Sequence, residues 1–291
     1  MGYSHKITLA AAFSCCVTLP LPAAANSKAE KLYQLSLADL SKVEITSATG
    51  NSTPLDKAPA TASVITADEI AATGARTLAE VLETVPGLHV GLSTLSRLEP
   101  VYSIRGIHAG FNPHVLLLMN GVPVQFALQG GRPVMFRYPV KNIARVEVIR
   151  GPGSAIYGAD AYSGVINIIT KGGGDSFDDE VGTRAGSFGM RDAWVVGGWS
   201  PGAFALNYSV EYQRSDGDDG RVLEADLQTT FDTFFGTQAS LAPGPLSTRY
   251  EVTNIQLQAN YKNLVGNMWA WVSNDSGLGA GGAQALDYEG N

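Results

Sequence analysis

The chain of 291 residues is 45% hydrophobic, which is enough apolar sequence for one large or two ordinary packed domains and excludes disorder throughout. Its formal net charge of −7 at pH 7 argues against nucleic acid as a partner, because phosphate binding needs a basic face. The 33 glycines and a charged fraction of only 16% favour β-structure with many turns.

Residues 1–25 have the pattern of an export signal. Positive charge at His5 and Lys6 precedes an apolar run over residues 7–21, and small residues follow it, so we expect cleavage near Ala25. The alternative is an uncleaved membrane anchor, but the run is shorter than the ~20 residues that a spanning helix needs. Both cysteines, Cys15 and Cys16, lie in this run, so we expect neither a disulfide nor a thiol site in the exported chain.

Residues 26–59 are polar and rich in small residues, and they predict a flexible N-terminal arm. A short β-prone patch lies within the arm: Val43, Glu44, Ile45, Thr46, Ser47 and Ala48. An extended segment of this kind can add itself to the edge of a partner's sheet. The alternative is an ordinary linker with a little β-propensity.

From residue 60 the chain becomes regular. Thr66 followed by Glu69 has the spacing of a capping box, which predicts a short helix ended by Gly74. A second box at Thr77 and Glu80 predicts another short helix with one apolar face, formed by Leu78, Val81, Leu82 and Val85.

The same region contains several predicted strands. Asn120-Gly121 is the strongest two-residue signal for a type I′ hairpin. Glycines at 151, 153, 158 and 164 predict a compact turn region without a helix between two apolar strands. Together these elements predict an α+β domain over residues 60–172. Its strands are expected at residues 62–66, 103–105, 115–119, 122–126, 144–149 and 165–170.

Beyond residue 178, period-2 alternation replaces the helical pattern. Over residues 204–213 an apolar residue alternates with a polar or small one, as expected for a strand with one apolar face. A tight hairpin joins this strand to residues 193–199, a long loop follows at 216–246, and a second strand pair is predicted at 249–261 and 264–272. Short turns alternating with a long loop are typical of outer-membrane β-barrels.

Aromatic residues are frequent in these strands. We expect them to form the girdles at the two membrane interfaces, as barrels require. The alternative is a soluble β-sandwich with buried aromatic residues. The residues concerned are Trp194, Trp199, Tyr208, Tyr212, Tyr250, Tyr261, Trp269 and Trp271.

Residues 143–171 read IARVEVIRGPGSAIYGADAYSGVINIITK, and this stretch closely resembles the signature of the plug domain of TonB-dependent outer-membrane receptors. The segments APATASVITADEI, TLAEVLETVPGLHV, SIRGI and VLLLMNGVPV also resemble the family, in the family's order. The resemblance implies an α+β plug domain followed by antiparallel transmembrane β-barrel strands over residues 178–291. It implies a receptor in the Gram-negative outer membrane rather than an enzyme.

The resemblance also implies partners. A plug inside a barrel of about 22 strands would gate the uptake of a scarce small-molecule ligand, such as a ferric siderophore, with haem or cobalamin as alternatives. Lipid of the outer membrane and the TonB energy-coupling protein would be the other partners. Residues 43–48 occupy the place of the TonB box, although Glu44 interrupts the consecutive valines or isoleucines that the family favours.

Several residue roles follow from the resemblance alone. Arg105 and Arg150 are expected at the boundary of plug and barrel, paired with barrel glutamates; the alternative is two surface arginines in strand-end turns. The candidates for ligand contact are Arg97, His108, Phe111 and His114. No cofactor, catalytic residue or metal site is expected, because the glycine pattern fails a nucleotide-binding motif at Ile156 and no metal-binding motif is present.

The chain supplies four to five barrel strands, which cannot close a cylinder. We therefore expect a truncated receptor or the first part of a longer one. The second hypothesis is a soluble periplasmic binding or regulatory module, in which the α+β domain folds alone and transports nothing.

Overall fold

The computed structural model describes residues 44–46, 53–54, 61–93, 100–108, 114–125, 131–133, 136–172, 179–277 and 285–286. The first part of the chain contains β1 (Glu44–Ile45), β2 (Thr53–Pro54), β3 (Ala62–Thr66), α3 (Ala67–Thr73), α4 (Leu78–Leu82), β4 (Leu88–Leu92), β5 (Pro100–Ile104), β6 (Val115–Met119), β7 (Val122–Pro123), β8 (Ile143–Arg150), α5 (Ser154–Tyr157), the 3-10 turn η2 (Ala159–Ala161) and β9 (Gly164–Thr170). The second part contains β10 (Glu180–Ala185), β11 (Arg191–Trp199), β12 (Phe204–Ser215), β13 (Val222–Leu223), α6 (Leu227–Phe235), β14 (Gly244–Pro245), β15 (Tyr250–Tyr261) and β16 (Leu264–Ser276).

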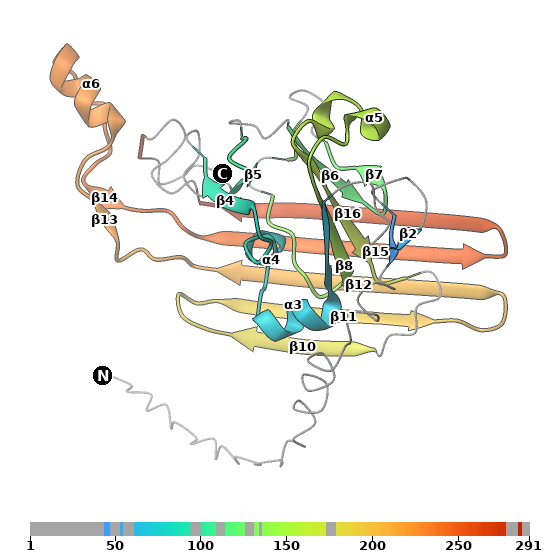
Figure 1. Ribbon diagram of the computed structural model, residues 1–291. Coiled ribbons are helices and arrows are strands. Elements are labelled where there is room, and N and C mark those ends of the chain that lie inside the picture. The colour runs from blue at the N-terminus through green and yellow to red at the C-terminus, as the bar shows by residue number, and fades with distance from the viewer. Residues whose placement is uncertain are drawn as a thin grey trace, which may run out of the picture.

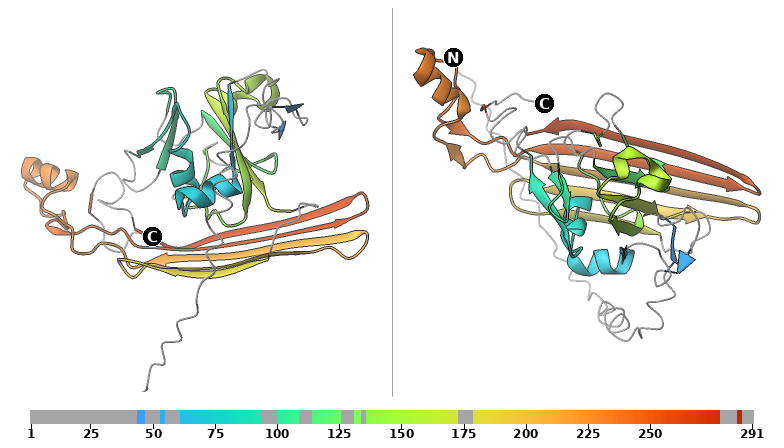
Figure 2. Two further views of the ribbon diagram at one scale, coloured as in Figure 1. Left: turned by 60° about the horizontal axis from the view of Figure 1, so that its bottom comes forward. Right: turned by 45° about the horizontal axis from the view of Figure 1, so that its top comes forward.

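Ten of these strands form two five-stranded sheets that lie against each other, and the pairs β1-β2, β4-β5 and β13-β14 form separate two-stranded sheets. The first five-stranded sheet has the order β3-β8-β9-β6-β7 and belongs to a mixed α+β unit, and the second has the order β10-β11-β12-β15-β16. Figures 1 and 2 show the α+β unit on one face of the second, curved sheet, with the strands of the first sheet running across those of the second.

The first sheet is buried on both faces. One face packs under α3 and α4 with Tyr102, Phe136 and Tyr138, and the other face packs around Leu116, Leu118, Ile149 and Val165. Every residue of β6 is therefore buried, which explains why its sequence VLLLM is continuously apolar rather than alternating.

The capping box predicted at the start of the first helix is confirmed. The Thr66 hydroxyl accepts the Glu69 N–H at 3.3 Å, and the Glu69 carboxylate accepts the Thr66 N–H at 2.7 Å. Gly74 ends α3 in the left-handed conformation, with φ of 72°. Both ends of this seven-residue helix are thus fixed by local chemistry.

Replacing Thr66 by alanine is expected to lower the free energy of unfolding by about 1 kcal/mol, since a helix N–H then loses its side-chain acceptor. Denaturant unfolding followed by circular dichroism would measure the change. Thr66→Ser is the matched control, because it keeps the hydroxyl acceptor at the N-cap. A loss in Thr66→Ala no larger than in Thr66→Ser would contradict the role of the cap.

The second predicted box is formed only in part. The Thr77 hydroxyl accepts the Glu80 N–H at 3.5 Å, as predicted, but the Glu80 carboxylate accepts the N–H of Arg76 at 2.7 Å instead of that of Thr77. Leu78, Val81 and Leu82 form the predicted apolar face and are buried. The shifted box fixes the backbone of Arg76 directly before α4.

The predicted hairpin at Asn120-Gly121 is confirmed. Both residues have positive φ, 50° and 80°, as a type I′ turn requires. The second strand β7 is shorter than predicted, with two residues. The Asn120 side-chain amide donates to the Thr170 hydroxyl at 2.9 Å and accepts the Thr170 N–H at 3.0 Å. These two hydrogen bonds connect the turn to the end of β9.

The glycine-rich region between β8 and β9 differs from the prediction. The single-turn helix α5 and the 3-10 turn η2 form where a turn without a helix was expected. Gly153 precedes α5 without a side-chain cap, so the sequence carried no capping signal for it. Gly164 is required sterically: a Cβ there would overlap the Ile104 side chain and the Ile149 carbonyl oxygen.

In the second sheet every pair of neighbouring strands is antiparallel, and short turns alternate with one long connection. The predicted strands are confirmed, with β10 added at one edge. The sheet is open, with β10 and β16 as its edges among the described strands.

The two faces of this sheet have opposite chemistry. The face toward the α+β unit carries buried polar side chains, namely Asp192, Asn207, Ser209, Glu211, Gln213, Ser215, Asn254 and Gln256. The opposite face exposes apolar side chains, including Val181, Val195, Val210, Leu257, Met268 and Val272. A soluble β-sandwich would have the reverse arrangement, with the apolar face covered.

The connection between β12 and β15 is a structured loop. It contains the β13-β14 pair and α6, which projects beyond the sheet (Figure 1). Burial alone would raise the pKa of Asp226, but hydrogen bonds from Leu286 N–H, the Ser240 hydroxyl and Thr229 outweigh it and lower the pKa to about 2. The sequence predicted the loop but not its helix.

None of the described helices is both long and apolar enough to cross a membrane.

Candidate functional site

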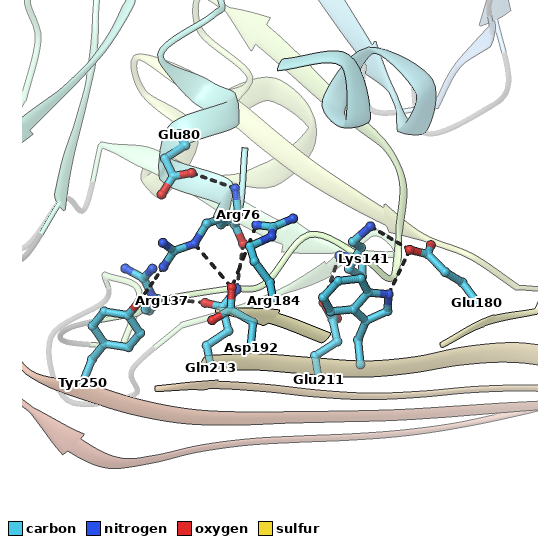
Figure 3. A network of polar contacts seen from close by, with 11 residues as sticks. Arg76, Glu80, Arg137, Lys141, Glu180, Arg184, Asp192, Glu211, Gln213 and Tyr250 are labelled. Atoms are coloured by element: carbon cyan, nitrogen blue, oxygen red, sulfur yellow. Dashed lines mark hydrogen bonds and ion pairs between the residues drawn. The ribbon is translucent and has the colours of Figure 1, made fainter. Parts of the chain in front are cut away.

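A network of hydrogen bonds and ion pairs connects the α+β unit to the polar face of the second sheet (Figure 3). The α+β unit contributes Arg76, which precedes α4, and residues 136–142, which precede β8. The sheet contributes polar side chains from β10, β11, β12 and β15. We call this contact surface the seam.

An ion-pair cluster lies at one end of the seam. Arg76 Nε lies 3.4 Å from Asp192 Oδ2, and Arg184 Nη1 lies 3.9 Å from the same oxygen. The Asp192 side chain is only 4% exposed, so its charge depends on these cations for compensation. Arg76 also donates to the Tyr250 hydroxyl, which links the cluster to β15.

Arg137 extends this cluster. Its guanidinium lies 3.8 Å from the centre of the Tyr250 ring, and its Nε donates to Gln213 Oε1 at 3.1 Å. Gln213 Nε2 in turn donates to the Arg76 carbonyl oxygen at 3.0 Å. Burial lowers the pKa of Arg137, with the nearby Tyr250 acting in the opposite direction.

Glu211 is the buried carboxylate at the middle of the seam. It accepts the Lys141 N–H at 2.8 Å and the Asn254 side-chain amide at 3.3 Å. The Lys141 ammonium lies 2.7 Å from Glu180 and 4.5 Å from the centre of the Trp194 ring. Lys141 therefore contacts three strands of the sheet: its backbone N–H binds β12, and its side chain contacts β10 and β11.

Amide groups fill the other end of the seam. Gln256 Oε1 accepts the Asn142 amide at 2.7 Å, and Gln256 Nε2 donates to the Thr170 hydroxyl at 3.1 Å. The buried Tyr138 hydroxyl lies 3.5 Å from Gln256 Oε1. Burial raises the pKa of Tyr138 far above its usual value, and the charge of Glu211 acts in the same direction. Tyr138 is therefore a neutral hydrogen-bonding group at any physiological pH.

Aromatic residues of the second sheet correct the girdle prediction. The indoles of Trp269 and Trp271 face the seam, where they pack on Phe136, and the Trp271 N–H donates to the Arg137 carbonyl at 3.0 Å. Trp194 and Tyr250 also face the seam: Lys141 lies over the Trp194 ring, and Arg137 lies over the Tyr250 ring. These four residues cannot contact lipid, because strand alternation places them on the covered face.

Trp199 and Tyr261 lie on the opposite face and remain compatible with a girdle. They are 61% and 48% exposed, at the ends of β11 and β15. Both lie beside short turns, and Trp199 contacts Phe204 with the ring centres 6.0 Å apart. They could therefore mark one boundary of an apolar band on this face.

Two cavities border the ion-pair cluster. Their volumes are about 310 and 350 Å³, and both are lined by Glu80, Arg137, Thr248 and Tyr250. The seam is thus tightly hydrogen-bonded around Glu211 and Gln256 and less tightly packed beside the long loop.

The arginines predicted to pair with barrel glutamates lie elsewhere in the α+β unit. Arg150 donates to the Pro86 carbonyl oxygen and to the Ser63 hydroxyl, both within the same unit. Arg105 is exposed in a turn with φ of 54°. The described part of the second sheet supplies neither with a glutamate, so their pairing with the barrel stays a prediction.

The predicted ligand-contact residues are only partly described. His108 is exposed, and His114 packs against Tyr162 with the ring centres 5.7 Å apart. Arg97 and Phe111 lie outside the described residues. Among the residues that the structure describes, no group of three or more His, Cys, Asp or Glu side chains could hold a metal ion.

The predicted coupling patch is described over three residues. Glu44 and Ile45 form β1, which pairs with β2, and Thr46 follows. Val43, Ser47 and Ala48 lie outside the described residues. This short segment contacts the face of the first sheet that is not covered by α3 and α4.

The residues that the α+β unit contributes to the seam carry no recognisable sequence signal. Arg76, Arg137 and Lys141 stand in segments without periodicity, and their partners are distant in sequence. The polar face of the sheet is visible in the sequence, because Asn207, Ser209, Glu211 and Gln213 alternate with apolar residues, but alternation alone does not tell whether such a face meets water or another part of the protein.

Comparison with known proteins agrees with this architecture. Residues 54–165 match the family described as TonB-dependent Receptor Plug Domain. This part of the chain is a TonB-dependent receptor plug domain. The seam is therefore the contact between the plug domain and the antiparallel strands that follow it.

Curated relatives share this part of the chain. The Vitamin B12 transporter BtuB of Vibrio vulnificus (strain CMCP6) is 40% identical over 141 residues, which is 48% of this chain and 22% of the relative. The protein of the same name from Photobacterium profundum is 34% identical over 171 residues, 54% of this chain and 27% of the relative. The matched region is thus about a quarter of each relative's length.

Solved structures share the fold at lower identity. The pyoverdine outer membrane receptor FpvA from Pseudomonas aeruginosa PAO1 aligns with a TM-score of 0.57 at 18% identity, covering 78% of this chain and 29% of that one. BauA, the ferric preacinetobactin receptor from Acinetobacter baumannii, aligns with a TM-score of 0.55 at 18% identity, covering 78% of this chain and 30% of that one. The plug domain and the strands after it are therefore arranged as in these receptors.

Proposed function

We propose that the chain is the plug domain and first wall strands of an outer-membrane receptor for energy-coupled uptake of a scarce ligand. The observation that carries this proposal is the chemistry of the second sheet, whose apolar face is exposed and whose polar face is covered by the plug domain. Lipid is the environment in which an exposed apolar sheet face is stable, and a transmembrane barrel is polar on its inner side.

The strand lengths support a membrane location. β11, β12, β15 and β16 have 9, 12, 12 and 13 residues, and a tilted transmembrane strand needs about 9–11. The open edges of β10 and β16 would leave unpaired N–H and C=O groups in lipid, which cost several kcal/mol each. The function therefore requires further strands that pair with these edges and close the wall.

Energy coupling is assigned to residues 43–48. This patch would bind the TonB protein as an added strand, after removal of the leader near Ala25. Arg105 and Arg150 are assigned to seating of the plug against wall strands other than β10 to β16. Arg97, His108, Phe111 and His114 are assigned to contact with the ligand.

The ligand class follows from the relatives. Curated relatives are named as vitamin B12 transporters, and structural neighbours are named as receptors for ferric siderophores or bound to them. We propose a metal chelate of this kind, with a ferric siderophore as the first candidate and cobalamin or haem as alternatives. The protein would carry the chelate as cargo and hold no resident cofactor.

Uptake assays in a strain that lacks its own receptors would test the function. Cells expressing the chain with a complete barrel should accumulate one labelled chelate, and deletion of residues 43–48 should abolish accumulation while leaving binding at the cell surface. Binding and uptake that both survive this deletion would contradict the assignment of the coupling patch. Failure to bind any siderophore, haem or cobalamin would contradict the ligand class.

One observation favours a second function, that of a soluble periplasmic binding or regulatory module. All buried residues of the two apolar core clusters come from residues 45–168, so the plug domain could fold without the second sheet. Expression of residues 44–172, which contain both core clusters, without detergent tests this possibility. A protease-resistant soluble domain, together with no ligand uptake by the receptor with a complete barrel, would favour it over transport.

A further inference from the structure

A cavity of about 310 Å³ lies between the plug domain and the second sheet, next to the end of the long loop that joins β12 to β15. Its floor is buried, and it is formed by Phe136 and Tyr138 of the plug domain and by Val252 of β15. Its rim is half-exposed and includes Arg137 and Tyr250. We call this space the Arg137 cavity.

The Arg137 cavity lies at the end of the sheet that carries the long loop. Thr248 precedes β15 and Gly277 follows β16, and both line the cavity. The short turns at 200–203 and 262–263 lie at the opposite strand ends, and the long loops of outer-membrane barrels are extracellular. A molecule that arrives from outside the cell therefore reaches this cavity before it reaches the hydrogen-bonded middle of the seam around Glu211.

Arg137 gives the cavity a positive charge. Among the described residues no carboxylate contacts its guanidinium, which donates from Nε to Gln213 Oε1 at 3.1 Å and lies over the Tyr250 ring (Figure 3). Burial lowers the pKa of Arg137, and the nearby charge of Arg76 acts in the same direction. Because a buried cation is stabilised by a paired anion, a negatively charged group in the cavity would be bound favourably.

The other charged residues of the cavity are already engaged. Arg249 pairs with Asp275, with Nε and Oδ1 2.8 Å apart. Glu80 is exposed, and its carboxylate accepts the Arg76 N–H at 2.7 Å. Arg137 is therefore the cation that remains available to an anion.

The floor of the cavity suits a flat ring. The ring centres of Phe136 and Tyr138 are 5.8 Å apart, and the Tyr250 ring forms an adjoining wall. Aromatic side chains pack favourably against other rings in stacked or edge-on arrangements. Since pockets for whole small molecules span about 300–1,000 Å³, this cavity has room for one substituted ring but not for a complete metal chelate.

We propose that the Arg137 cavity binds one anionic aromatic ring, such as a catecholate or a benzoate, with Arg137 as its cationic contact. This inference rests on the proposed function and deepens it, because it names a chemical group of the ligand. Neither His108 nor His114 lines the cavity, so the site is additional to the ligand contacts assigned above. The ring is either an arm of a ferric chelate or a free aromatic acid.

Isothermal titration calorimetry on the detergent-solubilised receptor with a complete barrel measures this binding. The probe is 2,3-dihydroxybenzoate, which carries one ring and one carboxylate. Benzamide, which has a ring but no charge, is the control ligand. We expect saturable binding of the acid with a Kd below about 1 mM, at least about tenfold tighter than that of benzamide.

A cavity-filling substitution tests the location of the site. Ala79 lines the cavity from α4, and its side chain makes none of the hydrogen bonds of the seam. Ala79→Phe should weaken binding of the acid at least about tenfold, because the new ring occupies the space of the probe. Ala72→Phe is the matched control, since it places the same ring at an exposed position of α3 and should leave the affinity unchanged.

A charge substitution tests the role of Arg137. Arg137→Gln should weaken binding of the acid about tenfold, because the ionic hydrogen bond is lost. Arg191→Gln, at an exposed position of β11, should not change it. An absence of saturable binding of 2,3-dihydroxybenzoate would overturn the proposal, as would an unchanged affinity in both Ala79→Phe and Arg137→Gln.

The ferric complex of the same acid identifies the source of the ring. If Ala79→Phe weakens binding of both the free acid and its ferric complex, the cavity holds an arm of a chelate. If Ala79→Phe weakens binding of the free acid alone, the cavity holds a free aromatic acid.

These outcomes are separable from those of the proposed function. Calorimetry measures binding whether or not cells take up a ligand. If the acid binds in the cavity but no chelate is taken up, transport fails and the site stands. If a chelate is taken up but the acid does not bind, transport stands and the site fails.

Discussion

Replacing Asp192 by alanine is expected to weaken the contact between the plug domain and the second sheet by about 3 kcal/mol. The Asp192 side chain is 4% exposed beside Arg76 and Arg184, whose side chains are 24% and 33% exposed, and its removal leaves these two partly buried cations without their acidic partner. Limited proteolysis of the plug domain in detergent, over a range of urea concentrations, would measure the loss.

Asp216→Ala is the matched control. It removes the same side chain from the same end of the sheet, but Asp216 and its partner Arg214 are 59% and 49% exposed. Exposed ion pairs contribute about 0–1 kcal/mol, so this variant should behave as the parent chain does. Equal effects of the two substitutions would contradict the claim that the seam holds the plug domain in place.

Gly164→Ala is expected to have the second large effect, with about 3 kcal/mol lost from the stability of the plug domain. A Cβ at this position would overlap the Ile149 carbonyl oxygen and the Ile104 side chain. The carbonyl belongs to the strand paired with β9, so it cannot move without breaking the pairing of β8 and β9. Denaturant unfolding followed by far-UV circular dichroism would give the change in free energy.

Gly91→Ala is the control for this prediction. Gly91 also lies in a strand of the plug domain, but the nearest atom to its added Cβ is a carbonyl oxygen at 4.0 Å, an ordinary contact. Its effect should stay within about 1 kcal/mol of the parent, the usual scale for glycine and alanine in a strand. A Gly164→Ala variant as stable as Gly91→Ala would show that the crowding is relieved by local movement.

Features that depend on neighbouring residues could be predicted from the sequence. The capping box at Thr66 and Glu69, the Asn120-Gly121 turn and the alternation in β12 all act within a few residues, and the structure confirms them. The helix α6 is not predicted, although Asp226 caps it. Its apolar pattern is short and lies within a long segment that otherwise has the composition of a loop.

Features that depend on distant contacts could not be predicted. The prediction that Trp269 and Trp271 belong to an interface girdle is wrong. Composition does not give the register of a strand, and a shift of one residue exchanges its two faces. Arg76 and Gln213 are 137 residues apart in sequence yet share a hydrogen bond, and no local pattern marks either as a partner of the other.

The position of the second sheet in the membrane is the central claim, and spin labels test it most directly. Labels at Val210 and Leu257, on the exposed apolar face, would be compared in lipid vesicles with labels at Ser187 and Lys262, in the turns at opposite ends of the strands. We expect labels at Val210 and Leu257 to collide more with oxygen than with a water-soluble nickel chelate, and labels at the turn positions to show the reverse. Ready access of the nickel chelate to Val210 and Leu257 would contradict it.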